Sequence, residues 1–193
     1  VESTLIEQGH SEIAKAYILY RHERRKVRDE KMKVLNTQTL DSVSKNFDLN
    51  CLRVLASRYL LRNNKNEITE TPFSMFERVA ILIGVGDLLH DDQVFSNSGN
   101  LQQDVSEAEE YLSKLDQFNY KFKVGNYYLN QYHFRGLVNG YIDIAKKGKA
   151  KIGFKQVLTQ LAAKKFDDYE ARITEYLSLM TSQTFLPNSP TMM

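Results

Sequence analysis

The apolar side chains of this sequence recur at helical spacing through most of its length. Steps of three and four residues place them on one face of successive segments, which is the pattern of amphipathic helices. The helices predicted by this spacing cover residues 10–33, 49–60, 72–83, 105–121 (with Phe118 on its apolar face), 128–146, 154–162 and 167–180. The pattern therefore predicts a mainly α-helical chain.

Several residues mark where these helices begin and end. Thr71-Pro72 is a strong start, with Thr as N-cap and Pro at the first helical position. The stretch Gly84 to Gly86 favours a helix end over a phosphate-binding loop, because no third glycine or basic residue follows it. Asp167 and Glu170 have the spacing of a capping box. The helix over 72–83 is apolar on nearly all its faces, so we expect it at the centre of the fold.

Two segments depart from the helical pattern. Residues 58–70 hold two short runs on either side of an asparagine-rich stretch at 63–66, which predicts a small β-hairpin with its turn at the asparagines. Residues 91–104 are rich in Ser, Asn and Gly and predict a surface loop. The fold class predicted is thus mainly α with one possible small hairpin.

Composition narrows the class of protein. The 193 residues carry 26 Lys and Arg against 24 Asp and Glu, a net charge of +2 that implies no bulk attraction to nucleic acid or membrane. We see no apolar run long enough to span a bilayer and no signal segment, so a soluble cytoplasmic protein is expected. The single cysteine excludes an internal disulfide and a cysteine-rich metal site.

Few residues suggest chemistry. Residues 21–33 hold seven basic side chains against three acidic ones, which indicates either a solvated helix face or a site for nucleotide phosphate. The tyrosines from Tyr127 to Tyr141 favour a core face over base stacking. Cys51 is interpreted as a packing residue. His90 and the two aspartates after it lack the spacing of metal ligands, so no metal ligand is assigned.

Three blocks of the sequence resemble one known family. The tail from Phe185 reads Phe-Leu-Pro-Asn-Ser-Pro-Thr-Met-Met, and residues 52–61 and 68–80 precede it in the matching order. Together they resemble the large chain of ribonucleotide reductases, especially the adenosylcobalamin-dependent class II group. Residues 1–9 and 13–21 are similar to the closing helices of an ATP-cone, the allosteric nucleotide domain of that family.

The resemblance implies a domain organisation. Residues 1–35 are expected to be the C-terminal remnant of an ATP-cone, 36–183 the N-terminal helical domain, and 184–193 the start of the substrate loop at the entry to an α/β barrel. The chain is accordingly expected to be an N-terminal fragment cut at both ends, without the cysteines that carry the family's chemistry. No catalytic residue is assigned here, and Cys51 receives no catalytic role.

The resemblance also implies an activity for the whole protein. It would reduce ribonucleotides to deoxyribonucleotides for DNA synthesis through a thiyl radical, as a ribonucleoside-diphosphate reductase. Adenosylcobalamin would supply the radical, a thioredoxin-type protein the reductant and ATP or dATP the allosteric control, in a homodimer that needs no membrane or nucleic acid. The sequence Asn-Ser-Pro-Thr at 188–191 favours class II. A class I radical source and triphosphate substrates remain as alternatives.

The resemblance further points to residues near nucleotides. Asn188, Ser189 and Thr191 match the loop beside the substrate, where hydroxyl and amide groups suit phosphate oxygens. For the effector triphosphate, Arg21, Arg24 or Arg25 match the stretch that supplies a basic side chain.

One rival interpretation comes from the residues alone. The basic stretch 21–33 and the tyrosines are also compatible with a stand-alone helical module that binds nucleic acid. A steep salt dependence of binding by the isolated chain would favour that rival, because phosphate contacts release counterions.

Overall fold

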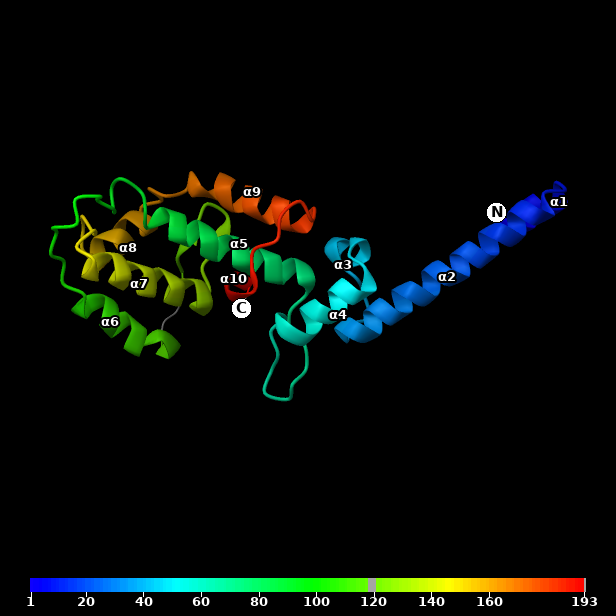
Figure 1. The fold of residues 1–193 in the computed structure, drawn as a ribbon, viewed down its shortest axis with the longest axis horizontal. Helices are drawn as coiled ribbons and strands as arrows, with labels where there is room; N and C mark the ends of the chain where they lie inside the picture. The colour runs from blue at the N-terminus through cyan, green and yellow to red at the C-terminus, as the bar shows by residue number, and fades with distance from the viewer. Residues whose placement is uncertain (118–120, 193) are drawn as a thin grey trace. The chain divides into compact units, whose positions relative to one another are not determined.

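The computed structural model describes residues 1–117 and 121–192, and within them the chain is mainly α-helical, which confirms the predicted fold class (Figure 1). The chain divides into two compact units. The first comprises Val1–Met75 with Met192, and the second Phe76–Thr191. The division falls after the first turn of helix α5 (Pro72–Leu88).

The first unit is built from four helices. They are α1 (Glu2–Glu7), α2 (Ser11–Leu35), α3 (Ser42–Asn46) and α4 (Leu49–Arg58). The predicted helix over 10–33 is confirmed as α2, which ends where Asn36 takes a left-handed φ of 50°. Leu35, Leu52 and Leu55 are buried where α2 packs on α4. The short helix α3 lies in a polar stretch where no helix was predicted.

Carboxylates cap α3 and α4, at Asp41 and Asp48. The Asp41 Oδ1 accepts the Ser44 backbone N–H at 2.6 Å, and its Oδ2 accepts that of Phe73 at 3.2 Å. One side chain therefore caps α3 and the first turn of α5. Burial by itself raises the pKa of Asp41, but these hydrogen bonds outweigh it and hold the pKa below its usual value. The predicted cap at Thr71 is also present, since its Oγ1 accepts the Ser74 N–H at 3.1 Å.

The predicted hairpin over 58–70 exists in a minimal form. The Thr69 N–H donates to the Leu61 carbonyl at 2.9 Å and the Asn63 N–H to the Glu67 carbonyl at 3.0 Å. A single bridge joins Arg62 to Ile68, so the arms pair without forming strands. The asparagine turn is where it was expected, and Asn66 has a φ of 63°.

The second unit surrounds the rest of α5. Its other elements are α6 (Ser106–Ser113), η1 (Leu115–Gln117), β1 (Lys123–Val124), β2 (Tyr127–Tyr128), α7 (Gln131–Lys146), α8 (Phe154–Ala162), α9 (Tyr169–Thr181) and α10 (Ser189–Met192), of which the last ends in the first unit. Figure 1 shows α5 between α9 and α7, with α6 on the far side of α7.

The apolar helix α5 is central, as predicted, and glycines let its neighbours approach closely. A Cβ added at Gly84 would lie 2.4 Å from Cγ1 of Ile173 on α9. On α7, a Cβ at Gly136 would lie 2.4 Å from Cδ1 of Leu82, and one at Gly140 2.6 Å from Cδ1 of Leu89. The helix continues to Leu88, so the predicted end at Gly84 is wrong. Gly84 is a contact point between helices.

The predicted helix over 105–121 is shorter than expected, and a small hairpin follows it. The helix over 105–121 ends at Ser113 and is followed by the 3-10 turn η1, while Phe118, assigned to its apolar face, lies outside the described residues. Strands β1 and β2 then pair antiparallel about Gly125, whose φ is 56°. Tyr128 on β2 is 70% exposed, so the tyrosines do not form one core face, although Tyr141 is buried.

The hairpin is attached to the start of α9. The Gly125 N–H donates to Asp167 Oδ1 at 3.1 Å, and the Asn126 Nδ2 donates to Glu170 Oε1 at 2.6 Å. Asp168, not Asp167, is the N-cap of α9, and its side chain makes no capping hydrogen bond. The predicted capping box is therefore wrong, because the carboxylates of Asp167 and Glu170 both bind the hairpin.

The buried His133 joins α7 to α5. Its Nδ1 accepts the Asn130 N–H at 3.2 Å in a capping box, and its Nε2 lies 3.0 Å from the Arg78 carbonyl oxygen. A neutral ring protonated at Nε2 satisfies both hydrogen bonds. Burial lowers the pKa of His133 to about 4.

The contact between Gly84 of α5 and Ile173 of α9 predicts opposite effects on stability for two glycine substitutions in α5. Gly84→Ala forces its Cβ against the buried Ile173, and we expect it to destabilise the second unit by about 1–3 kcal/mol. Gly86→Ala is the matched control, because a Cβ there meets nothing within 4 Å. It should be neutral or stabilise by up to about 1 kcal/mol. Urea unfolding measures both, and equal effects would contradict the close approach.

His133 predicts a loss of stability in acid. The imidazole of His133 takes up a proton near pH 6.5 in the unfolded chain and near pH 4 in the folded one. The contribution of neutral His133 to the free energy of unfolding is therefore complete above pH 6.5 and is lost as the pH falls toward 4. We expect about 2 kcal/mol of the free energy of unfolding to be lost between pH 7 and pH 5. His133→Gln keeps a donor and an acceptor but does not titrate. An unchanged pH dependence in that variant would refute the assignment.

Candidate functional site

The predicted effector arginines line one open groove of the first unit. Arg21, Arg24 and Arg25 lie on the second half of α2 and face the segment 38–46 across a space of about 1030 Å³. Steps of three and four residues along a helix bring such side chains to one surface. The structure therefore brings the three candidate residues to one groove, and their effector-binding role stays a prediction.

Further polar groups in this groove were not singled out from the sequence. Arg28 continues the helical step from Arg24 and Arg25, a signal that the spacing contained. Thr39 and Lys45 enter from the segment after α2. No local pattern marks these two, because only the packing of α3 and its flanking residues beside α2 brings them into the groove.

Lys31 holds the two sides of the groove together. Its Nζ donates to the carbonyl oxygens of Ser44 at 3.1 Å and Lys45 at 2.8 Å, in the last turn of α3. Burial of the ammonium group, together with the nearby charge of Arg24, lowers the pKa of Lys31. Lys31 therefore serves as a structural link within the basic stretch, and the cations around it stay at the surface.

Two acidic side chains balance part of this charge. Glu2 Oε1 lies 2.7 Å from Nη1 of Arg21, and its hydrogen bond raises the pKa of the guanidinium. Asp29 lies 3.9 Å from Nε of Arg25. Both pairs are exposed to solvent, so each is weak and open to competition by another anion. The groove can accommodate phosphate oxygens if Glu2 is displaced.

The predicted substrate residues lie in the second unit. After α9 the chain turns at Gln183, whose φ is 62°, and reaches the one-turn helix α10. The Thr191 N–H donates to the Asn188 carbonyl oxygen at 3.1 Å, and its Oγ1 donates to Asn188 Oδ1 at 2.9 Å. Asn188 is exposed and Ser189 half-buried. The structure thus brings the three residues into one turn.

The remaining chemistry-bearing residues have structural surroundings. Burial and the charge of Asp48 raise the pKa of the Cys51 thiol, which makes it a poor nucleophile at neutral pH. Within residues 1–117 and 121–192, no group of three or more His, Cys, Asp or Glu is placed to hold a metal ion. None of the helices described there is long and apolar enough to cross a membrane.

Comparisons with known proteins agree with the resemblance seen in the sequence. Residues 45–122 match the family described as "Ribonucleotide reductase, all-alpha domain". The chain is 30% identical over 187 residues to the vitamin B12-dependent ribonucleoside-diphosphate reductase of Thermoplasma acidophilum. That match covers 95% of this chain and 21% of the relative, so the chain spans about a fifth of the relative's length. No solved structure matches the chain.

Proposed function

We infer that the intact protein reduces ribonucleoside diphosphates to deoxyribonucleotides, because residues 45–122 match the all-alpha domain of ribonucleotide reductases. The observation that carries this proposal is the match of 95% of the chain to an enzyme of that name. The chain itself would provide the helical domain and the first substrate loop. Neither the described residues nor the comparisons favour the nucleic-acid-binding alternative.

The cofactor and partners of the proposed enzyme follow from the relative's name and from the resemblance. The relative is named vitamin B12-dependent, which supports adenosylcobalamin as the source of the radical. The resemblance adds a thioredoxin-type reductant, control by ATP or dATP, a homodimer and a cytoplasmic role in DNA synthesis. Cys51 is the single cysteine of the sequence, and we assign it no part in the thiol chemistry that we propose.

The two histidines of the second unit, His90 and His133, do not fit a cobalamin site. Both ring nitrogens of the buried His133 are engaged, by Asn130 and by the Arg78 carbonyl. Nδ1 of His90 lies 2.9 Å from the Gly86 carbonyl oxygen, and the cavity beside it, of about 220 Å³, is smaller than the usual range for drug-sized ligands. We therefore assign no ligand of that cofactor to this chain.

The proposed part of Asn188, Ser189 and Thr191 is to bind the substrate phosphates. Ser and Thr hydroxyls and backbone amides donate hydrogen bonds to phosphate oxygens. The Thr191 N–H and hydroxyl both donate to Asn188, so Thr191 fixes the turn before any ligand arrives. The groups that would donate to phosphate are then the Ser189 hydroxyl and the side-chain amide of Asn188. A turn that is already ordered loses little conformational entropy on binding. These properties support a role in positioning the nucleotide.

The proposed part of the α2 groove is to bind the effector triphosphate. Arg21, Arg24 and Arg25 present guanidinium groups, which bind phosphate oxygens with two parallel hydrogen bonds. The pair between Glu2 and Arg21 would be exchanged for a pair with phosphate. Because both partners are exposed, the exchange costs little.

The activity is tested by assaying the intact protein for deoxynucleotide formation from CDP or ADP, with adenosylcobalamin and a dithiol. Ser189→Ala is expected to raise KM about tenfold with kcat little changed, the effect of losing one hydrogen bond to a charged phosphate. Ser113→Ala, at an exposed position on α6, is the control. Absence of product would refute the proposed activity. An unaltered KM in Ser189→Ala would refute the role of the loop alone.

Effector binding is tested by calorimetric titration of the intact protein with ATP. Arg24→Gln is expected to weaken binding about fivefold to twentyfold, because a charge-assisted hydrogen bond is lost. Glu2→Gln should tighten it, because the carboxylate that competes for Arg21 is gone. Arg53→Gln, on α4, serves as the control for net charge. Equal affinities in the wild type and Arg24→Gln would contradict the assignment.

A further inference from the structure

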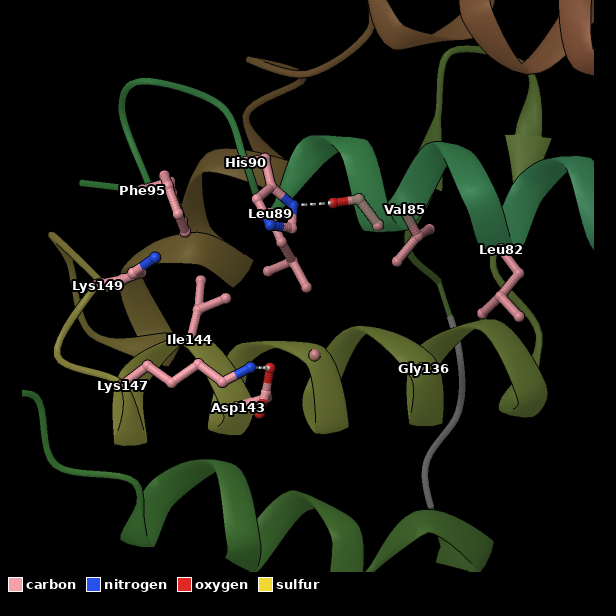
Figure 2. Close-up of a pocket in the computed structure, with 12 residues that line it drawn as sticks. Leu82, Val85, Leu89, His90, Phe95, Gly136, Asp143, Ile144, Lys147 and Lys149 are labelled. Carbon is pink, nitrogen blue, oxygen red and sulfur yellow. Dashed lines mark hydrogen bonds and ion pairs between the residues drawn. The ribbon is translucent and has the colours of Figure 1, made fainter. Parts of the chain in front are cut away.

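The second unit contains a small pocket between α5 and α7 that the proposed function does not use. Its volume is about 220 Å³. Figure 2 shows Leu82 and Val85 of α5, with Leu89 directly after it, directed toward α7, and Ile144 on the opposite wall. Ile144 and Leu89 are almost completely buried. The floor of the pocket is therefore apolar.

Gly86 keeps this pocket open. A Cβ added at Gly86 would meet nothing within 4 Å. At Gly136 and Gly140, by contrast, the space beside the glycine is filled by Leu82 and Leu89. An engineered apolar cavity of about 150 Å³ in another protein holds a benzene ring. The pocket beside Gly86 accordingly suits a single ring or a short branched chain.

The mouth of the pocket carries an excess of positive charge. Lys147 Nζ lies 2.6 Å from Asp143 Oδ2, which offsets one cation. Lys149 Nζ lies 5.4 Å from the centre of the Phe95 ring, at the same rim (Figure 2). Asp143, Lys147 and Lys149 together leave one net positive charge beside an apolar cavity. A ligand with an apolar body and one negative charge complements both features.

Backbone pairing holds the rim in place. The Ser96 N–H donates to the Lys149 carbonyl at 2.7 Å, and the Lys151 N–H donates to the Val94 carbonyl at 2.7 Å. The His90 ring packs 4.8 Å from that of Phe95, and its Nδ1 lies 2.9 Å from the Gly86 carbonyl oxygen. The ring and the cation at the mouth are thus positioned before a ligand binds, which reduces the entropy lost on binding.

We propose that this pocket binds a small organic monoanion, a carboxylate on a single aromatic ring or a short branched aliphatic body. The ring or chain enters beside Gly86 and contacts the leucines of α5. The carboxylate remains at the mouth with Lys149. A carboxylate fits better than a phosphate monoester, because the latter carries close to two negative charges at neutral pH and the mouth offers one positive charge.

The proposal is tested with 4-fluorobenzoate, whose binding to the intact protein is followed by ¹⁹F NMR. We expect a Kd of about 1–10 mM, as befits a ligand of ten heavy atoms. The neutral 4-fluorobenzamide, of nearly the same shape, should bind about threefold to fivefold more weakly, because it lacks the charge paired with Lys149.

Two series of variants separate the cavity from the charge. Gly86→Ala and Gly86→Leu should weaken binding progressively as the space fills, with thermal unfolding measured to confirm that each variant is folded. Lys149→Met should reduce the affinity for the acid to that of the amide. Lys146→Met, which removes a cation paired with Glu109, should leave binding unchanged.

The outcomes decide the proposal without reference to reductase activity. Undetectable binding of 4-fluorobenzoate, equal affinity for the acid and the amide, or undiminished binding in folded Gly86→Leu would each overturn it. Binding that depends on Gly86 and Lys149 in a protein without reductase activity would support this site and count against the proposed function only.

Discussion

The close contact of α5 with the helices on either side is the constraint on which the second unit depends. Gly84 admits Ile173 of α9. On α7, Gly136 admits Leu82 of α5 and Gly140 admits Leu89, the residue after α5. Protein interiors are packed as densely as organic crystals, so a methyl group added at such a contact requires the helices to separate. The same glycines bring α5 and α7 near enough for their side chains to enclose a pocket with an apolar floor.

Polar side chains at a few points connect segments that are far apart in the sequence. Asp41 caps two helices, Lys31 binds the carbonyl groups at the end of α3, and His133 joins α7 to the Arg78 carbonyl. Each satisfies backbone groups that helix ends or crossings leave without a partner, which would be costly in a buried position. These contacts determine where the chain turns, whereas apolar burial supplies most of the stability.

The regions we relate to nucleotides belong to different units and rest on different physics. The α2 groove combines several exposed guanidinium groups, which attract anions. Each planar guanidinium loses little side-chain entropy for every hydrogen bond that it forms. The turn at Asn188 and Thr191 has no such charge and instead offers hydrogen-bonding groups in an ordered backbone. A charged open surface suits an effector that binds reversibly, while an ordered turn suits a substrate that must be oriented for reaction.

Local sequence by itself determined the fold class, the extent of α2 and the start of α5 after Thr71. Helical periodicity and helix capping depend on residues within a few turns of each other. Only the tertiary structure decided the features that depend on contacts with residues distant in the sequence. Asp167 and Glu170 bind a hairpin instead of capping α9. Gly84 lies inside α5, where its lack of a side chain leaves room for Ile173 of α9. Lys45 joins the basic groove for the same reason: its neighbours come from another part of the chain, and no local spacing encodes them.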